Sequence, residues 1–138
     1  MPVLLRLKNA LIDWALPAWF LSCALLFALS TLCVILNFGL RQPTFDQYKE
    51  YGNYLRQPFL ASILMIENGH HPVFPALIAN IEILWFGADQ TLQLAIGTLC
   101  VFLAAACIAW TVWRHRELPR VARAAGVMLA ALGVLWLA

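Results

Sequence analysis

The chain has 138 residues, of which 63% are hydrophobic and only 12% are charged, and its mean hydropathy is +0.79. About half of the residues of an ordinary soluble domain are apolar, so this composition is typical of an integral membrane protein. The formal net charge of +2 is too small to indicate nucleic-acid binding.

A transmembrane helix is predicted over residues 14–38. The run from Ala15 to Phe38 has no charged residue and reaches about 36 Å at about 1.5 Å per residue, enough to cross a hydrocarbon core of about 30 Å. The apolar core of a secretory signal is only about 7–15 residues long and precedes a small-residue cleavage site, so we expect a retained helix. Pro17 would lie in its first turn, where a missing amide costs little.

Residues 39–90 are predicted to form a long polar loop, and its first half brings ionisable residues close to the end of the helix. Asp46 lies eight residues beyond Phe38, at the depth where a lipid phosphate would arrive. Three basic residues could bind that phosphate by charge-assisted hydrogen bonds: Arg41, Lys49 and Arg56. The alternative is structural, because aspartate is also a preferred cap for the start of a helix.

Three tyrosines in the same half, Tyr48, Tyr51 and Tyr54, recur at a spacing of three. We interpret them as anchors at the membrane surface, where aromatic rings with a polar group are common.

The second half of the loop places Glu67, His70 and His71 around the turn signal Asn68-Gly69. Two imidazoles and a carboxylate can ligate a divalent metal or contact a phosphate. Adjacent histidines in a loop need not converge, however, and metal sites usually space their ligands more widely. We therefore predict a substrate-binding role for these residues and assign no metal ligand, although the donor set is compatible with a divalent metal.

A shorter helix is predicted over residues 73–86. Pro72 and Gly87 suit its two ends, and Asn80 and Glu82 lie off its apolar stripe. Fourteen residues reach only about 21 Å, too short to cross a bilayer, so we expect the helix to lie in or against the membrane surface. A lipid-facing Glu82 would be costly, so we expect it to point to protein or water. The stripe consists of Phe74, Leu77, Ile78, Ile81, Leu84 and Trp85.

A second transmembrane helix is predicted over 91–113, a basic connection over 114–123, and a third transmembrane helix over 124–138. The last is short for a crossing and could be truncated, because its 15 residues reach only about 22 Å. Basic residues flank the cytoplasmic ends of membrane helices, so the N-terminus and the 114–123 connection should be cytoplasmic and residues 39–90 periplasmic. The four cysteines lie inside apolar runs and are expected to be free: Cys23, Cys33, Cys100 and Cys107.

The predicted fold class is therefore all-α: a single polytopic membrane domain with about three transmembrane helices and a periplasmic loop that carries membrane-surface helices. An early acidic residue in the first outer loop of such a protein resembles the start of the GT-C superfamily, whose members are glycosyltransferases that use polyprenyl-phosphate-linked sugars. The motifs Asp46-Gln47-Tyr48 and Glu67 to Pro75 are also similar to the start of a group of uncharacterised bacterial membrane proteins. His71 stands where that pattern tends to have arginine.

The resemblance covers residues from Leu16 to Trp113 and implies a multi-pass protein of the bacterial inner membrane. It implies that Asp46 acts as a base toward the acceptor or helps to bind a metal. Because GT-C enzymes are several times longer, we expect either a fragment or a small relative without independent activity. The alternative function is non-catalytic, as an accessory or lipid-carrier translocation protein that binds a membrane-protein partner. The predicted substrate-binding residues are Arg41, Lys49, Glu67, His70 and His71.

Overall fold

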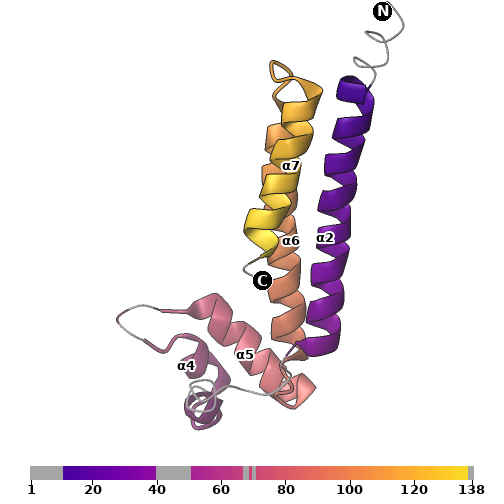
Figure 1. Ribbon diagram of the computed structural model, residues 1–138. Helices are drawn as coiled ribbons and strands as arrows, with labels where there is room; N and C mark the ends of the chain where they lie inside the picture. Colours follow the sequence, from indigo (N-terminus) through magenta and orange to yellow (C-terminus); the bar gives the residue numbers. More distant parts are fainter. Residues whose placement is uncertain (1–10, 40–50, 67–68, 70, 137–138) are drawn as a thin grey trace, which may run out of the picture. The chain divides into compact units, whose positions relative to one another are not determined.

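The computed structural model describes residues 11–39, 51–66, 69 and 71–136, and every regular element in these residues is helical (Figure 1). This confirms the all-α class. Residues 51–55 are helical as well. The elements in chain order are η1 (Leu11–Ala15), α2 (Leu16–Phe38), α4 (Phe59–Ile63), α5 (Val73–Phe86), α6 (Thr91–Arg114) and α7 (Arg120–Leu135).

Two helical stretches, Asp13–Phe38 and Thr91–Arg114, are long and apolar enough to cross a membrane. Within each stretch, only 6% of the most apolar 18-residue segment is buried inside the protein. The large apolar side chains are therefore left for lipid or another protein to cover. The sequence predicted both stretches. The third predicted crossing stays a prediction, because the 16 residues of α7 reach only about 24 Å.

The first long helix begins as a π-helix, η1, before it continues as α2. Pro17 has no backbone N–H, and in a regular α-helix its ring would clash with the carbonyl group of Asp13. The wider turns of η1 lie where this clash would occur. Pro17 is thus the second residue of α2 but not the beginning of the helical stretch.

The chain divides into two compact units, which we describe separately. The helical unit comprises Met1–Phe38 and Thr98–Ala138, and the loop unit comprises Gly39–Gly97.

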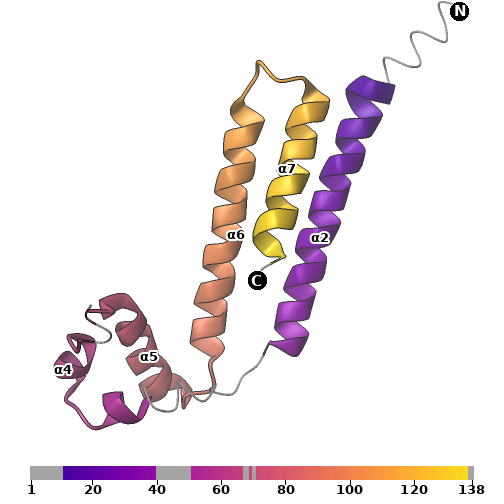
Figure 2. The same ribbon diagram turned by 60° about the vertical axis from the view of Figure 1, so that its left-hand side comes forward.

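Small residues form the interior of the helical unit. The helices α2, α6 and α7 run side by side, and α7 ends partway along the other two (Figure 2). Ala24, Ala105 and Ala124 are buried, and Ala124 has no exposed surface. Alanine lets helix backbones approach closely, as is common where helices pack inside membranes.

The connection between α6 and α7 is shorter than predicted, because α7 begins at Arg120 rather than at residue 124. Pro119, with an extended backbone at ψ 151°, precedes the first helical residue, and arginine is a good helix former. Arg120 and Arg123 therefore belong to the first turn of α7, and only residues 115–119 lie outside the helices.

The loop unit packs α4 and the helical residues 51–55 against α5. Its apolar core contains Tyr51, Tyr54, Ala76 and Ala79. The helix α5 spans the range that the sequence predicted, and it ends at Gly87, whose φ of 65° is the left-handed conformation that glycine adopts without strain.

Candidate functional site

Most of the predicted site residues lie outside the residues that the structure describes. Their roles stay predictions, and the structure bears only on the sixth residue, His71. The residues outside the described ranges are Arg41, Asp46, Lys49, Glu67 and His70.

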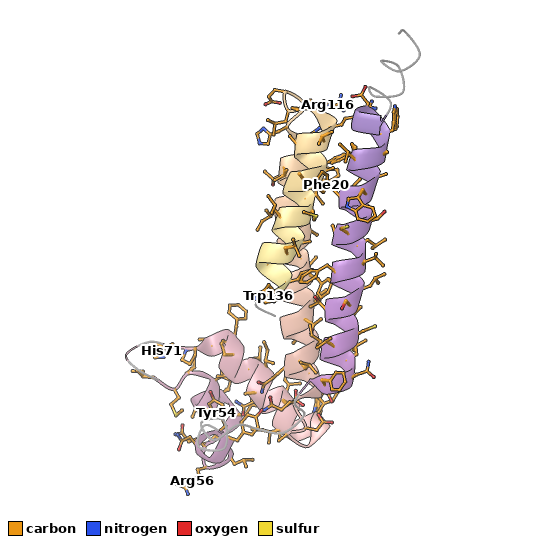
Figure 3. The ribbon with its side chains drawn as sticks, in the orientation of Figure 1. Phe20, Tyr54, Arg56, His71, Arg116 and Trp136 are labelled. Atoms are coloured by element: carbon orange, nitrogen blue, oxygen red, sulfur yellow. The ribbon has the colours of Figure 1, made fainter. Side chains whose placement is uncertain are left out.

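His71 is exposed and closes the turn between α4 and α5 (Figure 3). Its Nδ1 lies 2.9 Å from the carbonyl oxygen of Leu64. A carbonyl can only accept, so Nδ1 carries the hydrogen and the lone pair of the neutral ring is on Nε2. The imidazole is therefore oriented by the backbone, and Nε2 is the atom that could contact a ligand.

The most unusual residue of the loop unit is Glu82, a carboxylate on α5 with no exposed surface. Its Oε2 accepts a hydrogen bond of 2.9 Å from the backbone N–H of Gln93, in the first turn of α6. The first N–H groups of a helix have no partner within the helix, and a carboxylate at this end also interacts favourably with the helix dipole. Glu82 thus caps the start of α6.

The second oxygen of this carboxylate, Oε1, is buried and accepts no hydrogen bond from the described residues. Buried polar atoms are usually paired, because leaving one unpaired costs about 1–3 kcal/mol. Oε1 is therefore an acceptor with unused capacity.

The residue capped by Glu82, Gln93, also contacts a phenol group in the loop unit through its side chain. The hydroxyl oxygen of Tyr51 accepts hydrogen bonds from the side-chain amides of Gln93 at 2.6 Å and Gln90 at 3.2 Å. Tyr51 and Gln90 are buried. We call these four residues, Tyr51, Glu82, Gln90 and Gln93, the polar cluster.

A second buried polar contact joins α4 to α5. The Oγ atom of Ser62, which has no exposed surface, lies 3.0 Å from Oδ1 of Asn80. The amide group of Asn80 donates to the carbonyl oxygen of Ala76 at 2.8 Å. This contact fixes the two helices on each other but leaves little capacity for a ligand.

The outer surface of α5 is apolar, whereas its buried side carries polar groups as well as alanines. Phe74 and Trp85 on the predicted stripe are 78% and 79% exposed, whereas Asn80 and Glu82 are buried. The prediction that Glu82 points to protein or water is thereby confirmed. Exposed apolar side chains combined with buried polar groups suit a unit that contacts lipid.

The sequence missed two features of this site. Tyr51 and Tyr54 were interpreted as surface anchors, but they are only 6% and 4% exposed inside the loop unit, so that interpretation is wrong for both. Gln93 was not singled out, because a polar residue in the first turn of a long apolar helix is unremarkable by itself. The polar residues near Gln93, between the end of α5 and the start of α6, were the sequence feature that could have indicated this site.

The polar cluster can donate through its amides and accept through its carboxylate, a combination that suits a ligand rich in hydroxyl groups. The described residues contain no group of three or more acidic, histidine or cysteine side chains placed to bind a metal ion. The cysteines Cys23, Cys33, Cys100 and Cys107 are free. No family model, curated protein or solved structure matches the chain, so the site must be interpreted from its chemistry.

Proposed function

We propose that the protein is a multi-pass protein of the bacterial inner membrane that binds a polyprenyl-phosphate-linked sugar, as the N-terminal part of a GT-C-type glycosyltransferase would. The observation that carries this proposal is the unused acceptor Oε1 of Glu82. The other carboxylate oxygen accepts from the backbone of Gln93, and the side-chain amides of Gln93 and Gln90 both donate to the hydroxyl of Tyr51. Sugar hydroxyls both donate and accept hydrogen bonds, so they fit a cluster that contains a carboxylate and side-chain amides. Because Oε1 is covered, the loop unit must open for the sugar to reach it.

The proposed orientation places the N-terminus in the cytoplasm and residues 39–90 in the periplasm. Its support is the arginine-rich end of the second long apolar helix, with Arg114 as its last residue and Arg116 and Arg120 just beyond. Positively charged residues are retained on the cytoplasmic side.

In the proposed reaction, a hydroxyl oxygen of the acceptor forms a bond to the anomeric carbon of the carried sugar. The bond between that carbon and the phosphate oxygen breaks, and the carrier leaves as polyprenyl phosphate. Asp46 accepts the hydroxyl proton as a general base, while Arg41 and Lys49 offset the charge of the departing phosphate. Glu82 holds the sugar, and Glu67, His70 and His71 contribute further polar contacts.

The test uses the full chain in lipid nanodiscs with two probes, decaprenyl phosphate bearing one radiolabelled hexose and the same carrier without the hexose. We expect the glycosylated carrier to bind about tenfold more tightly, the effect of one hydrogen bond to a charged group. Glu82→Gln should remove this preference. Glu117→Gln is the matched control, because Glu117 lies in the 115–119 connection of the other unit. Equal binding of both carriers by the unaltered protein would refute sugar recognition.

Transfer of the label to glycerol separates the enzyme from its alternative. Asp46→Asn should stop transfer and leave binding intact. The second candidate function is a non-catalytic accessory or carrier-translocation protein, and the hydrogen bond from Gln93 to Glu82 favours it, since a carboxylate that caps a helix needs no substrate. Transfer of the label by the unaltered protein would exclude this second function.

A further inference from the structure

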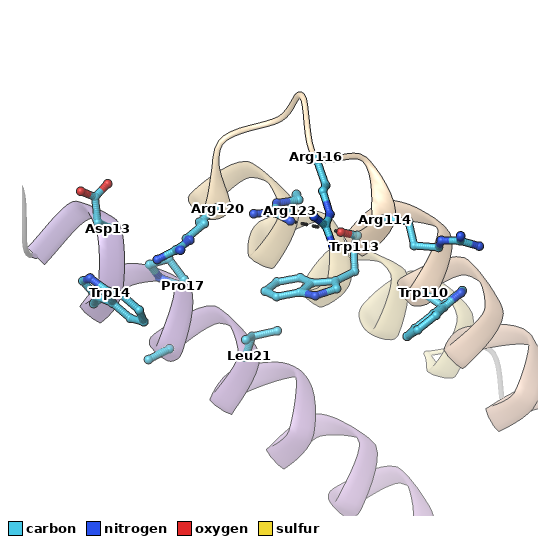
Figure 4. Close-up of a pocket in the computed structure, with 11 residues that line it drawn as sticks. Asp13, Trp14, Pro17, Leu21, Trp110, Trp113, Arg114, Arg116, Arg120 and Arg123 are labelled. Carbon is cyan, nitrogen blue, oxygen red and sulfur yellow. Dashed lines mark hydrogen bonds between the residues drawn. The ribbon is translucent and has the colours of Figure 1, made fainter.

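The helical unit contains a cleft that the proposed function does not use. The cleft has a volume of about 1170 Å³ and lies where the first helix begins and the connection between α6 and α7 turns back (Figure 4). Four arginines line it, Arg114, Arg116, Arg120 and Arg123, together with a single carboxylate, Asp13. The cleft therefore has a formal excess of three positive charges.

The side chains of the described residues leave this excess charge without ion-pair partners. Among the described residues, no carboxylate lies within ion-pair distance of these guanidinium groups, and the one ion pair in those ranges joins His115 to Glu117. Arg123 donates from Nη1 to the carbonyl oxygen of Trp113 at 3.3 Å, but its Nε is buried and has no acceptor there. Like charges gathered without a counter-ion repel one another, so an anion in the cleft would stabilise the unit.

Tryptophan rings hold three of the guanidinium groups in place. A guanidinium stacked on an indole face keeps its N–H groups free at the edge, where they can bind a phosphate in a bidentate manner. The three stacked pairs are Arg120 over Trp14 at 4.6 Å, Arg123 over Trp113 at 5.0 Å and Arg114 over Trp110 at 5.9 Å from the ring centres.

The position of the cleft along the helices indicates the kind of anion. Two stretches are long enough to cross a membrane, and both reach the cleft. Asp13 is the first residue of one stretch, and Arg114 is the last residue of the other. The ends of a membrane-spanning helix lie at the depth of the lipid headgroups, and tryptophan is enriched at that depth. Basic pockets between membrane helices bind headgroups with more than one phosphate.

We propose that this cleft is a binding site for an anionic phospholipid whose headgroup carries two phosphate groups. The phosphates replace the missing carboxylate partners of the arginines, and the acyl chains lie along the exposed apolar faces of α2 and α6. The proposal rests on the membrane location in the proposed function but not on its sugar site, because every residue of the cleft belongs to the helical unit.

The test measures lipid retention by native mass spectrometry on the full chain in neutral detergent. The probes are cardiolipin, phosphatidylglycerol and phosphatidylcholine. We expect cardiolipin to be retained at least tenfold better than phosphatidylcholine, and the double variant Arg116→Gln/Arg120→Gln to lose at least tenfold of that retention. Arg56→Gln, the control, removes one positive charge, half the change of the double variant, from an exposed side chain of the loop unit (Figure 3) and should retain cardiolipin normally.

Equal loss in Arg56→Gln would overturn the proposal, since net charge alone would then explain the binding. Unchanged retention by the double variant would overturn it as well. Displacement of cardiolipin by millimolar inorganic phosphate would show that the site takes free phosphate and not a lipid.

If the double variant loses its helical circular dichroism, Arg120→Lys replaces it. Lysine keeps the charge but not the bidentate, stacked geometry, so we expect a partial loss of retention, and normal retention would count against the site.

Discussion

The contact between α6 and α7 can be tested by adding a single methyl group. A Cβ atom at Gly126 would lie 2.6 Å from Cγ1 of Val112, whereas carbon atoms pack at about 3.5–4.0 Å. The overlap of about 1 Å must be relieved by moving the valine or separating the helices, which costs about 1–3 kcal/mol. Alanine gains about 1 kcal/mol over glycine in a helix, so Gly126→Ala should be neutral or destabilising by up to about 2 kcal/mol.

The matched control is Gly133→Ala in the same helix, because a Cβ atom there meets no other atom within 4 Å. This variant should show only the gain in helix propensity, about 1 kcal/mol. The two variants should therefore differ by about 1–3 kcal/mol, measured as the free energy of unfolding in detergent by circular dichroism. Val112→Ala should reduce the cost of Gly126→Ala, a coupling that a double-mutant cycle reports. Equal stability of the two glycine variants would refute the packing of α6 on α7.

Three further predictions concern individual polar residues. Glu82→Leu should lower the free energy of unfolding by about 1–3 kcal/mol, because the N–H of Gln93 loses its acceptor. Glu82→Gln keeps an acceptor and should lower this free energy less. Equal losses of stability in the two variants would refute the role of Glu82 as a cap. The pKa of Glu117 should lie below its usual range, because its carboxylate accepts a hydrogen bond from its own backbone amide and another from His115. Any stability that Glu117 contributes is therefore present at neutral pH and is lost as the pH falls through the lowered pKa. In a carboxyl NMR titration, His115→Gln should raise this pKa only part of the way, and an unchanged value would contradict the contact. In a variant without native cysteines, Asn68→Cys should react with an impermeant thiol reagent from the periplasm and His115→Cys only from the cytoplasm, and the reverse pattern would overturn the orientation.

The helices of this protein were predictable because their signals are local. An uncharged run of sufficient length identified the two long helices, and Pro72 and Gly87 marked the ends of α5. The start of α7 was less predictable, since Arg120 and Arg123 suggested a loop. Charge on the first turn of a helix does not prevent the helix when its side chains reach the surface, and Pro119 was the better signal.

The polar cluster was only partly predictable, because its contacts are tertiary. The position of Glu82 off the apolar stripe indicated that it faces protein or water, but nothing nearby identified Gln93, eleven residues on, as its partner. Tyr51 was misjudged for the same reason. Its amide partners, Gln90 and Gln93, lie about forty residues further along the chain, at separations of 39 and 42, and a spacing of three among tyrosines contains no information about them.

The distribution of apolar groups explains why polar residues define the sites of this protein. In the proposed membrane location, lipid tails would cover a leucine as well as another helix does, so large apolar side chains such as Leu26 and Leu103, 66% and 54% exposed, would do little to select one packing. Close contacts of small residues such as Ala124, and buried hydrogen bonds such as that of Glu82, select it instead. Oε1 of Glu82 and Nε of Arg123 are the two buried side-chain polar atoms in the described residues without a partner. Natural proteins seldom leave such groups unpaired, so these two atoms are where ligands should be sought.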